Sequence, residues 1–122
     1  MKKIVLIFVA LALFLAACST VTFPADDQHK KYGQKAIEIA DQFLDFDISI
    51  DEAYKKLEAL KKAESSLPSV EKDSKYYDGN KFIVNRVEIL EMKAFLATMK
   101  DDTSDILDAR NAIAEILGVS KR

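Results

Sequence analysis

The spacing of apolar residues along the chain predicts four helices. These residues recur at three- and four-residue steps, the period of a helix that packs on one side. The pattern predicts helices over 29–46, 50–66, 80–100 and 104–117, and no strand-like alternation of useful length. The positions expected to face inward are Tyr32, Ala36, Ile39, Ala40 and Phe43; Ile50, Ala53, Tyr54, Leu57, Leu60 and Ala63; Ile83, Val87, Leu90 and Ala94; and Ile106, Leu107, Ala109, Ile113, Ile116 and Leu117.

Residues that favour helix ends mark the boundaries of these elements. Ser49, followed three residues later by Glu52, is a capping-box signature for the second helix. Pro68 ends that helix, and Gly118 is placed to cap the last one. The short break at 47–49 favours a helical hairpin. We therefore predict an all-α fold, a small antiparallel bundle of about four helices in two hairpins, with a three-plus-one arrangement as the alternative.

The third helix is apolar beyond a single face. Six large side chains widen its inward stripe: Phe82, Ile89, Met92, Phe95, Leu96 and Met99. A helix that is hydrophobic all round is usually buried on all sides. This helix is therefore expected to be the most buried of the four.

The N-terminus has the parts of a secretory signal peptide. Lys2 and Lys3 precede an unbroken run of fourteen apolar residues, Ile4 to Ala17. An uncleaved membrane anchor is the alternative. Fourteen residues span only about 21 Å of helix, whereas a bilayer core is about 30 Å thick.

The tetrad Leu15-Ala16-Ala17-Cys18 resembles the lipobox of bacterial lipoproteins. The resemblance implies a diacylglyceryl group on the Cys18 thiol, cleavage between Ala17 and Cys18, and a mature chain that begins at Cys18. Cys18 is the sole cysteine, so no disulfide within the chain competes for it. Two or more acyl chains would hold the protein firmly to a membrane. The expected location is the cell envelope, at the outer membrane or the outer face of the cell membrane.

These inferences divide the chain into three parts. They are a lipoprotein signal peptide over 1–17, a lipidated cysteine with a flexible tether over 18–28, and a helical domain over 29–122. Without Lys2 and Lys3 the mature part carries a net charge of about −4. A chain with this net charge is not expected to have the basic surface that binds nucleic acid or the polybasic patch that binds anionic lipid.

An acidic stretch resembles part of a calcium-binding loop. Positions 1, 3, 5 and 7 of such a loop would hold Asp45, Asp47, Ser49 and Asp51. The loop also needs glycine at position 6 and glutamate at position 12, where this chain has Ile50 and Lys56. We therefore predict no metal site and a solvated acidic surface.

No set of residues predicts catalysis. His29 is the sole histidine and lies at the predicted tether, where nothing would fix its geometry. Since Cys18 is expected to carry lipid, no Ser–His or Cys–His pair can be assembled. Asp41 and Asp45 share one helix face without a predicted apolar pocket, which favours charged surface over an acid–base pair. No catalytic residue, cofactor or enzyme activity is predicted.

Two tyrosines in the 68–80 connection are candidate partner contacts. Tyr76 and Tyr77 each combine an apolar ring with a polar tip, a residue type enriched at interfaces. The alternative is that one ring caps the core beside Phe82. The sequence as a whole predicts a small membrane-anchored envelope lipoprotein that acts as a non-enzymatic binding module for an envelope protein. An accessory, inhibitor or immunity subunit of a transport or secretion system is the alternative.

Overall fold

The computed structural model of this protein describes residues 23–100 and 102–122. Over these ranges the chain forms four α-helices: α2 (Asp27–Leu44), α3 (Ile50–Lys62), α4 (Tyr77–Lys100) and α5 (Ser104–Leu117). A short 3₁₀ helix, η1 (Ala63–Ser66), extends α3. The described residues contain no strand, and the predicted all-α four-helix fold is confirmed.

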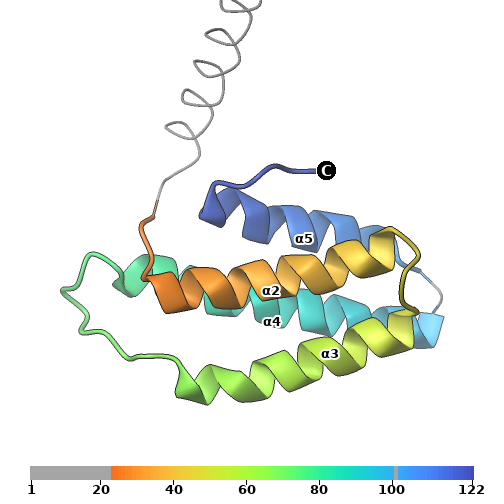
Figure 1. Cartoon of the computed structure of the whole chain (residues 1–122), viewed down its shortest axis with the longest axis horizontal. Helices are drawn as coiled ribbons and strands as arrows, with labels where there is room; N and C mark the ends of the chain where they lie inside the picture. The colour runs from red at the N-terminus through yellow and green to blue at the C-terminus, as the bar shows by residue number, and fades with distance from the viewer. Residues whose placement is uncertain (1–22, 101) are drawn as a thin grey trace, which may run out of the picture.

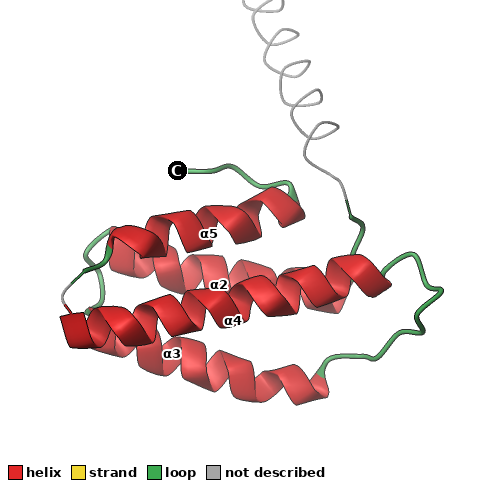
Figure 2. Cartoon of the chain, turned by 180° about the vertical axis from the view of Figure 1, so that it is seen from behind, coloured by secondary structure: helices red, strands yellow, loops and turns green. Residues whose placement is uncertain are grey.

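The four helices pack as an antiparallel bundle (Figures 1 and 2). Consecutive helices form two hairpins, α2 with α3 and α4 with α5. α2 and α4 contact each other, and each of them also contacts α3 and α5. α3 and α5 therefore lie on opposite sides of the α2–α4 pair. This arrangement leaves the side of α4 that faces away from α2 at the surface, as Figure 2 shows from behind.

The core consists of the predicted inward stripes. On α4 the stripe Ile83, Val87, Leu90 and Ala94 is fully buried, as are Leu57 on α3 and Ile113 on α5. Ile39, Phe43 and Tyr54 pack at the margin of the core and are only partly buried. The period of apolar residues therefore identified the inner face of each helix. Two predicted inward positions were wrong: Ala63 lies in η1, beyond the end of α3, and is exposed, and Leu107 is only partly buried and outside the core.

The segment before α2 differs from the prediction of a flexible tether up to residue 28. Residues 23–26 are packed on the bundle, and α2 begins two residues earlier than expected, at Asp27. Ala25 is buried, and the Phe23 ring lies 4.8 Å from the Phe82 ring. Gly79 makes this packing possible, because a Cβ there would lie only 2.0 Å from the carbonyl oxygen of Pro24.

The C-terminal ends of α2 and α5 share one capping geometry. At α5, Gly118 has a left-handed backbone with φ of 70°, and Val119 N–H donates to Ala114 C=O. At α2, Phe46 takes the same role with φ of 64°, and Asp47 N–H donates to Gln42 C=O. Both are Schellman caps, for which glycine is the favoured left-handed residue. The predicted cap at Gly118 is confirmed.

Candidate functional site

The outer face of α4 is the most unusual surface of the described molecule. The six large side chains that were expected to be buried are instead exposed, with exposed fractions from 36% at Phe82 to 66% at Met99. The prediction was wrong because α4 contacts α2, α3 and α5 on one side only. No described helix covers its other side. The side chains left at the surface are Phe82, Ile89, Met92, Phe95, Leu96 and Met99.

Five of these six residues lie, with Asn85, in two rows along α4. Phe82, Ile89 and Leu96 are seven residues apart, and so are Asn85, Met92 and Met99. Positions seven apart on a helix lie nearly in line, and the two rows are three or four residues from each other. Together with Phe95, which lies beside Met92 and Leu96 at one edge, they form one continuous surface, which we call the outer stripe of α4. Asn85, which is exposed, is its one polar member.

The edges of the outer stripe are tied to the neighbouring helices by polar contacts. On the α5 side, Arg86 donates a hydrogen bond of 2.6 Å to the Ala112 carbonyl, and Lys93 Nζ lies 3.4 Å from Asp105 Oδ2. On the α3 side, the Phe95 ring lies 5.3 Å from the Tyr54 ring. α4 is thus fastened to α5 and α3 along the two edges of the outer stripe.

A shallow hollow of about 240 Å³ borders the outer stripe between α3 and α4. Glu91 Oε2 is buried there and accepts no hydrogen bond from the described residues. Lys61 Nζ lies 3.4 Å from that oxygen, close enough for charge attraction although it is not aligned for a hydrogen bond. The hollow is lined by Tyr54, Lys61, Glu88, Glu91, Met92 and Phe95.

His29 is held more firmly than its place in the sequence suggested. Asp26 caps α2 by accepting from the His29 N–H at 2.8 Å, and both its carboxylate oxygens lie 2.9 Å from His29 Nδ1. The Asp26 N–H donates to Asn80 Oδ1, and Asn80 Nδ2 donates back to Asp26 Oδ2. Burial acts to raise the pKa of Asp26, but the hydrogen bonds from His29 and Asn80 outweigh it and lower that pKa. The expectation that nothing fixes His29 was therefore wrong.

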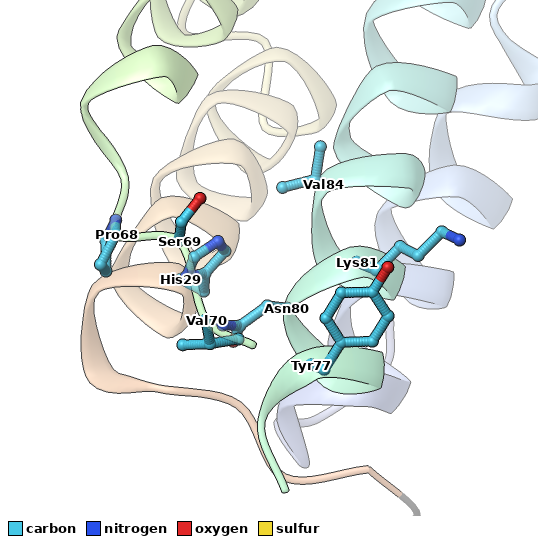
Figure 3. Close-up of a pocket in the computed structure, with 8 residues that line it drawn as sticks. All are labelled: His29, Pro68, Ser69, Val70, Tyr77, Asn80, Lys81 and Val84. Atoms are coloured by element: carbon cyan, nitrogen blue, oxygen red, sulfur yellow. The ribbon is translucent and has the colours of Figure 1, made fainter. Parts of the chain in front are cut away.

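A surface hollow of about 350 Å³ lies beside His29 (Figure 3). It is lined by His29, Pro68, Ser69, Val70, Tyr77, Asn80, Lys81 and Val84. Since a carboxylate only accepts, Nδ1 of His29 must donate to Asp26, which fixes the orientation of the ring. Among the described residues no hydrogen bond joins the Ser69 hydroxyl to His29. Asp26 thus fastens the start of α2 to Asn80 of α4, and its contact with His29 holds the imidazole in place.

The two candidate tyrosines lie at the start of α4. Tyr77 is its first residue and lines the hollow beside His29, and both rings are partly buried. Tyr76 lies under the Lys75 ammonium, 5.0 Å from the ring centre. The ring beside Phe82 is that of Phe23 rather than of a tyrosine. Partner contact through Tyr76 and Tyr77 stays a prediction.

The acidic end of α2 is paired with arginines. Asp41 accepts two hydrogen bonds from the buried Arg110, at 2.9 and 3.1 Å, and one from Arg122, which also donates to Asp45. Arg110 also donates to the Ser120 carbonyl at 2.6 Å. Burial acts to raise the pKa of Asp41, but the bonds from the two guanidinium groups lower it overall. These carboxylates fasten the C-terminal segment to α2.

Ser49 caps α3 as predicted, accepting a hydrogen bond of 3.2 Å from the Glu52 N–H. Within the part of the chain that the structure describes, no group of three or more His, Cys, Asp or Glu is placed to hold a metal ion. Ala17 and Cys18 lie outside the described residues. No helix in the described ranges is long and apolar enough to cross a membrane.

Comparisons of this chain with protein-family models, with curated proteins and with solved structures find no match. Inferences about function therefore rest on the residues and geometry of this chain.

Proposed function

We propose that this protein is a non-enzymatic interaction module of the bacterial cell envelope. A lipid on Cys18 holds it at a membrane, and the outer stripe of α4 binds protein. The single observation that supports binding is the row of large apolar side chains, 36 to 66% exposed, on one face of a well-packed helix. The largest apolar patch on the surface of a protein is often functional and marks a site of contact with a partner.

The composition of the outer stripe also favours protein binding. Aromatic residues and methionine are enriched at interfaces, and charged residues are depleted at their centres. Phe82, Met92 and Met99 belong to the first group, whereas the charges of Arg86 and Lys93 lie at the edge. An apolar centre with a charged rim is the usual anatomy of such a surface.

The anchoring part of the proposal rests on the lipobox-like tetrad that ends at Cys18. Mass spectrometry of the N-terminal peptide from membranes tests it directly. The expected mature chain begins at Cys18 and carries the mass of a diacylglyceryl group, and Cys18→Ser abolishes both the lipid and the cleavage. An intact leader, or an unmodified Cys18 thiol, would contradict this part of the proposal.

The binding part can be tested separately in living cells. A photo-reactive amino acid is placed at Met92 in the outer stripe or, as a matched control, at Glu38 on the exposed side of α2. Irradiation is expected to give protein adducts from position 92 and none from position 38. The absence of adducts from position 92 at normal expression would contradict binding through the outer stripe.

A further inference from the structure

We infer that a second copy of this chain covers the outer stripe, with the two α4 helices parallel and in register. The inference rests on the proposed function, since it names the partner of the same surface. The observations that carry it are the seven-residue period of the stripe, its area and the charges along its edges.

The period of the outer stripe is that of a helix–helix seam. Steps of three and four residues alternate without interruption from Phe82 to Met99. Apolar positions that repeat every 3.5 residues keep one helix in contact with another over several turns. Lipid is a poor occupant, because the Asn85 amide within the stripe would lose water without gaining a hydrogen-bond partner. A helix is the occupant that this period favours.

The area of the stripe matches a modest dimer. A large side chain has roughly 200 Å² of surface, so the six apolar side chains, exposed by 36 to 66%, offer about 550 Å². Specific interfaces begin at about 600 Å² per partner. Phe23, which is 37% exposed and whose ring packs at a tilt against Phe82, extends the apolar surface at one end. One helix face of a second copy would therefore suffice to cover the stripe.

Charges at the edges favour the parallel orientation. Arg86, Lys93 and Lys100 follow one edge of the stripe, and Lys81 and Glu88 lie on the other. In a parallel pair each Glu88 faces Lys93 of the second copy, twice by symmetry, at the cost of a like-charge contact between Lys81 and Arg86. An antiparallel pair would instead bring the two basic edges together.

Two further features agree with a parallel, in-register pair. Asn85 is the one polar residue within the seam, and a single buried asparagine fixes the register of paired helices because its amide needs the amide opposite. The five peptide units from Cys18 to Phe23 span at most about 17 Å. Since Phe23 packs against Phe82, parallel pairing places both lipid anchors at the same end, as expected for two copies on one membrane.

Cysteine cross-linking in intact membranes tests the pairing. In the lipidated chain Cys18 is blocked, so an engineered cysteine supplies the one free thiol. Phe82→Cys, Met92→Cys and Met99→Cys, at the two ends and the middle of the stripe, are each treated with a short bis-maleimide, with Glu38→Cys as the control. Each stripe variant is expected to give a product of twice the chain mass, and the control none.

Every other result overturns the inference. Linking at Met92 without linking at Phe82 and Met99 would indicate an antiparallel pair. Adducts of another mass would indicate a different protein partner. No cross-linking at any stripe position would mean that the outer stripe contacts lipid or nothing at all. Cross-linking of Glu38→Cys as strong as that of Met92→Cys would indicate random collision of chains in the membrane. The same cysteines in a Cys18→Ser chain, which keeps its leader but carries no lipid, report pairing without lipidation, so failure of lipidation and failure of pairing are told apart.

A charge reversal provides a second, independent test. Glu88→Lys, made in the Met92→Cys chain, is expected to lower the cross-linking yield about fivefold, the effect of losing two exposed ion pairs. Adding Lys93→Glu restores the attraction and should restore the yield. Equal yields from the single and double variants would exclude the proposed pairing of Glu88 with Lys93. Circular dichroism of each variant checks the fold, because Glu88 and Lys93 also lie 3.8 and 3.4 Å from Lys61 and Asp105 within the chain.

Discussion

Replacing Gly79 with alanine tests whether the segment before α2 is fastened to α4. Gly79 lies in the first turn of α4, where the chain at Pro24 crosses it. The added Cβ would lie 2.0 Å from the carbonyl oxygen of Pro24 and 2.7 Å from the carbonyl carbon of the same residue. Both atoms belong to the backbone, so the whole crossing segment must move. This movement would separate Asp26 from Asn80 and Phe23 from Phe82.

The size of the effect follows from the contacts that are lost. The Asp26 backbone N–H donates to the Asn80 amide oxygen at 3.0 Å, and the Asn80 amide donates to the Asp26 carboxylate at 2.8 Å; together these two hydrogen bonds contribute about 2 kcal/mol. The tilted ring pair Phe23–Phe82 contributes about 1 kcal/mol. Alanine returns up to about 1 kcal/mol through its better helix propensity. The expected net loss is about 2 kcal/mol, which lowers the melting temperature of a domain of this size by about 10 °C.

Urea unfolding followed by circular dichroism measures the loss, and hydrogen exchange at the Asp26 amide reports the detachment itself. Gly33→Ala is the matched control. Its Cβ meets only side-chain methyl groups, of Leu117 at 3.1 Å and Ile83 at 3.2 Å, which can yield slightly. It should change the free energy of unfolding by less than about 1 kcal/mol. A Gly79→Ala chain as stable as the wild type, with a protected Asp26 amide, would refute the packing of residues 23–26.

Two other substitutions test the ends of α2. Phe46→Gly should stabilise the protein by about 1 kcal/mol, because the backbone φ of 64° is costly for a residue with a large side chain and costs glycine little. The Phe46 side chain is 94% exposed, so its removal should lose no packing. A lower melting temperature of the variant would show that the ring makes a contact in the folded state. Asp41→Asn should cost about 2 kcal/mol at neutral pH, less than for a fully buried pair because Asp41 is 29% exposed. The folded-state pKa of Asp41 is lowered, so its contribution is present above its ordinary pKa of 3.8 and disappears as the pH falls through the lowered value. The gap in urea midpoint between wild type and Asp41→Asn should therefore close in acid; a constant gap would exclude this ion pair as its cause.

Much of the fold could be predicted because its signals are local. The cap at Ser49 involves residues three apart, and the turn at Gly118 needs only a left-handed residue at the helix end. The stripe from Ile83 to Ala94 repeats within a few turns of one helix. Each of these features depends on neighbours in sequence, so a pattern in the sequence is enough to reveal it.

Other features depend on residues far apart in the chain. Asp26 bonds to Asn80 across 54 positions, and Arg110 bonds to Asp41 across 69. No local pattern distinguishes these side chains from ordinary charged surface, which is why His29 was expected to be free and Asp41 to be solvated. Only packing brings each donor to its acceptor.

The sequence by itself determined that this chain forms four helices and which stripe of each one turns inward. Only the tertiary structure decided that α4, apolar on both faces, is covered on one of them. A helix carries its apolar residues whatever surrounds it, but whether a given face is buried depends on how many neighbours the bundle supplies. Here α2, α3 and α5 all lie on the same side of α4, and the outer stripe from Phe82 to Met99 remains at the surface.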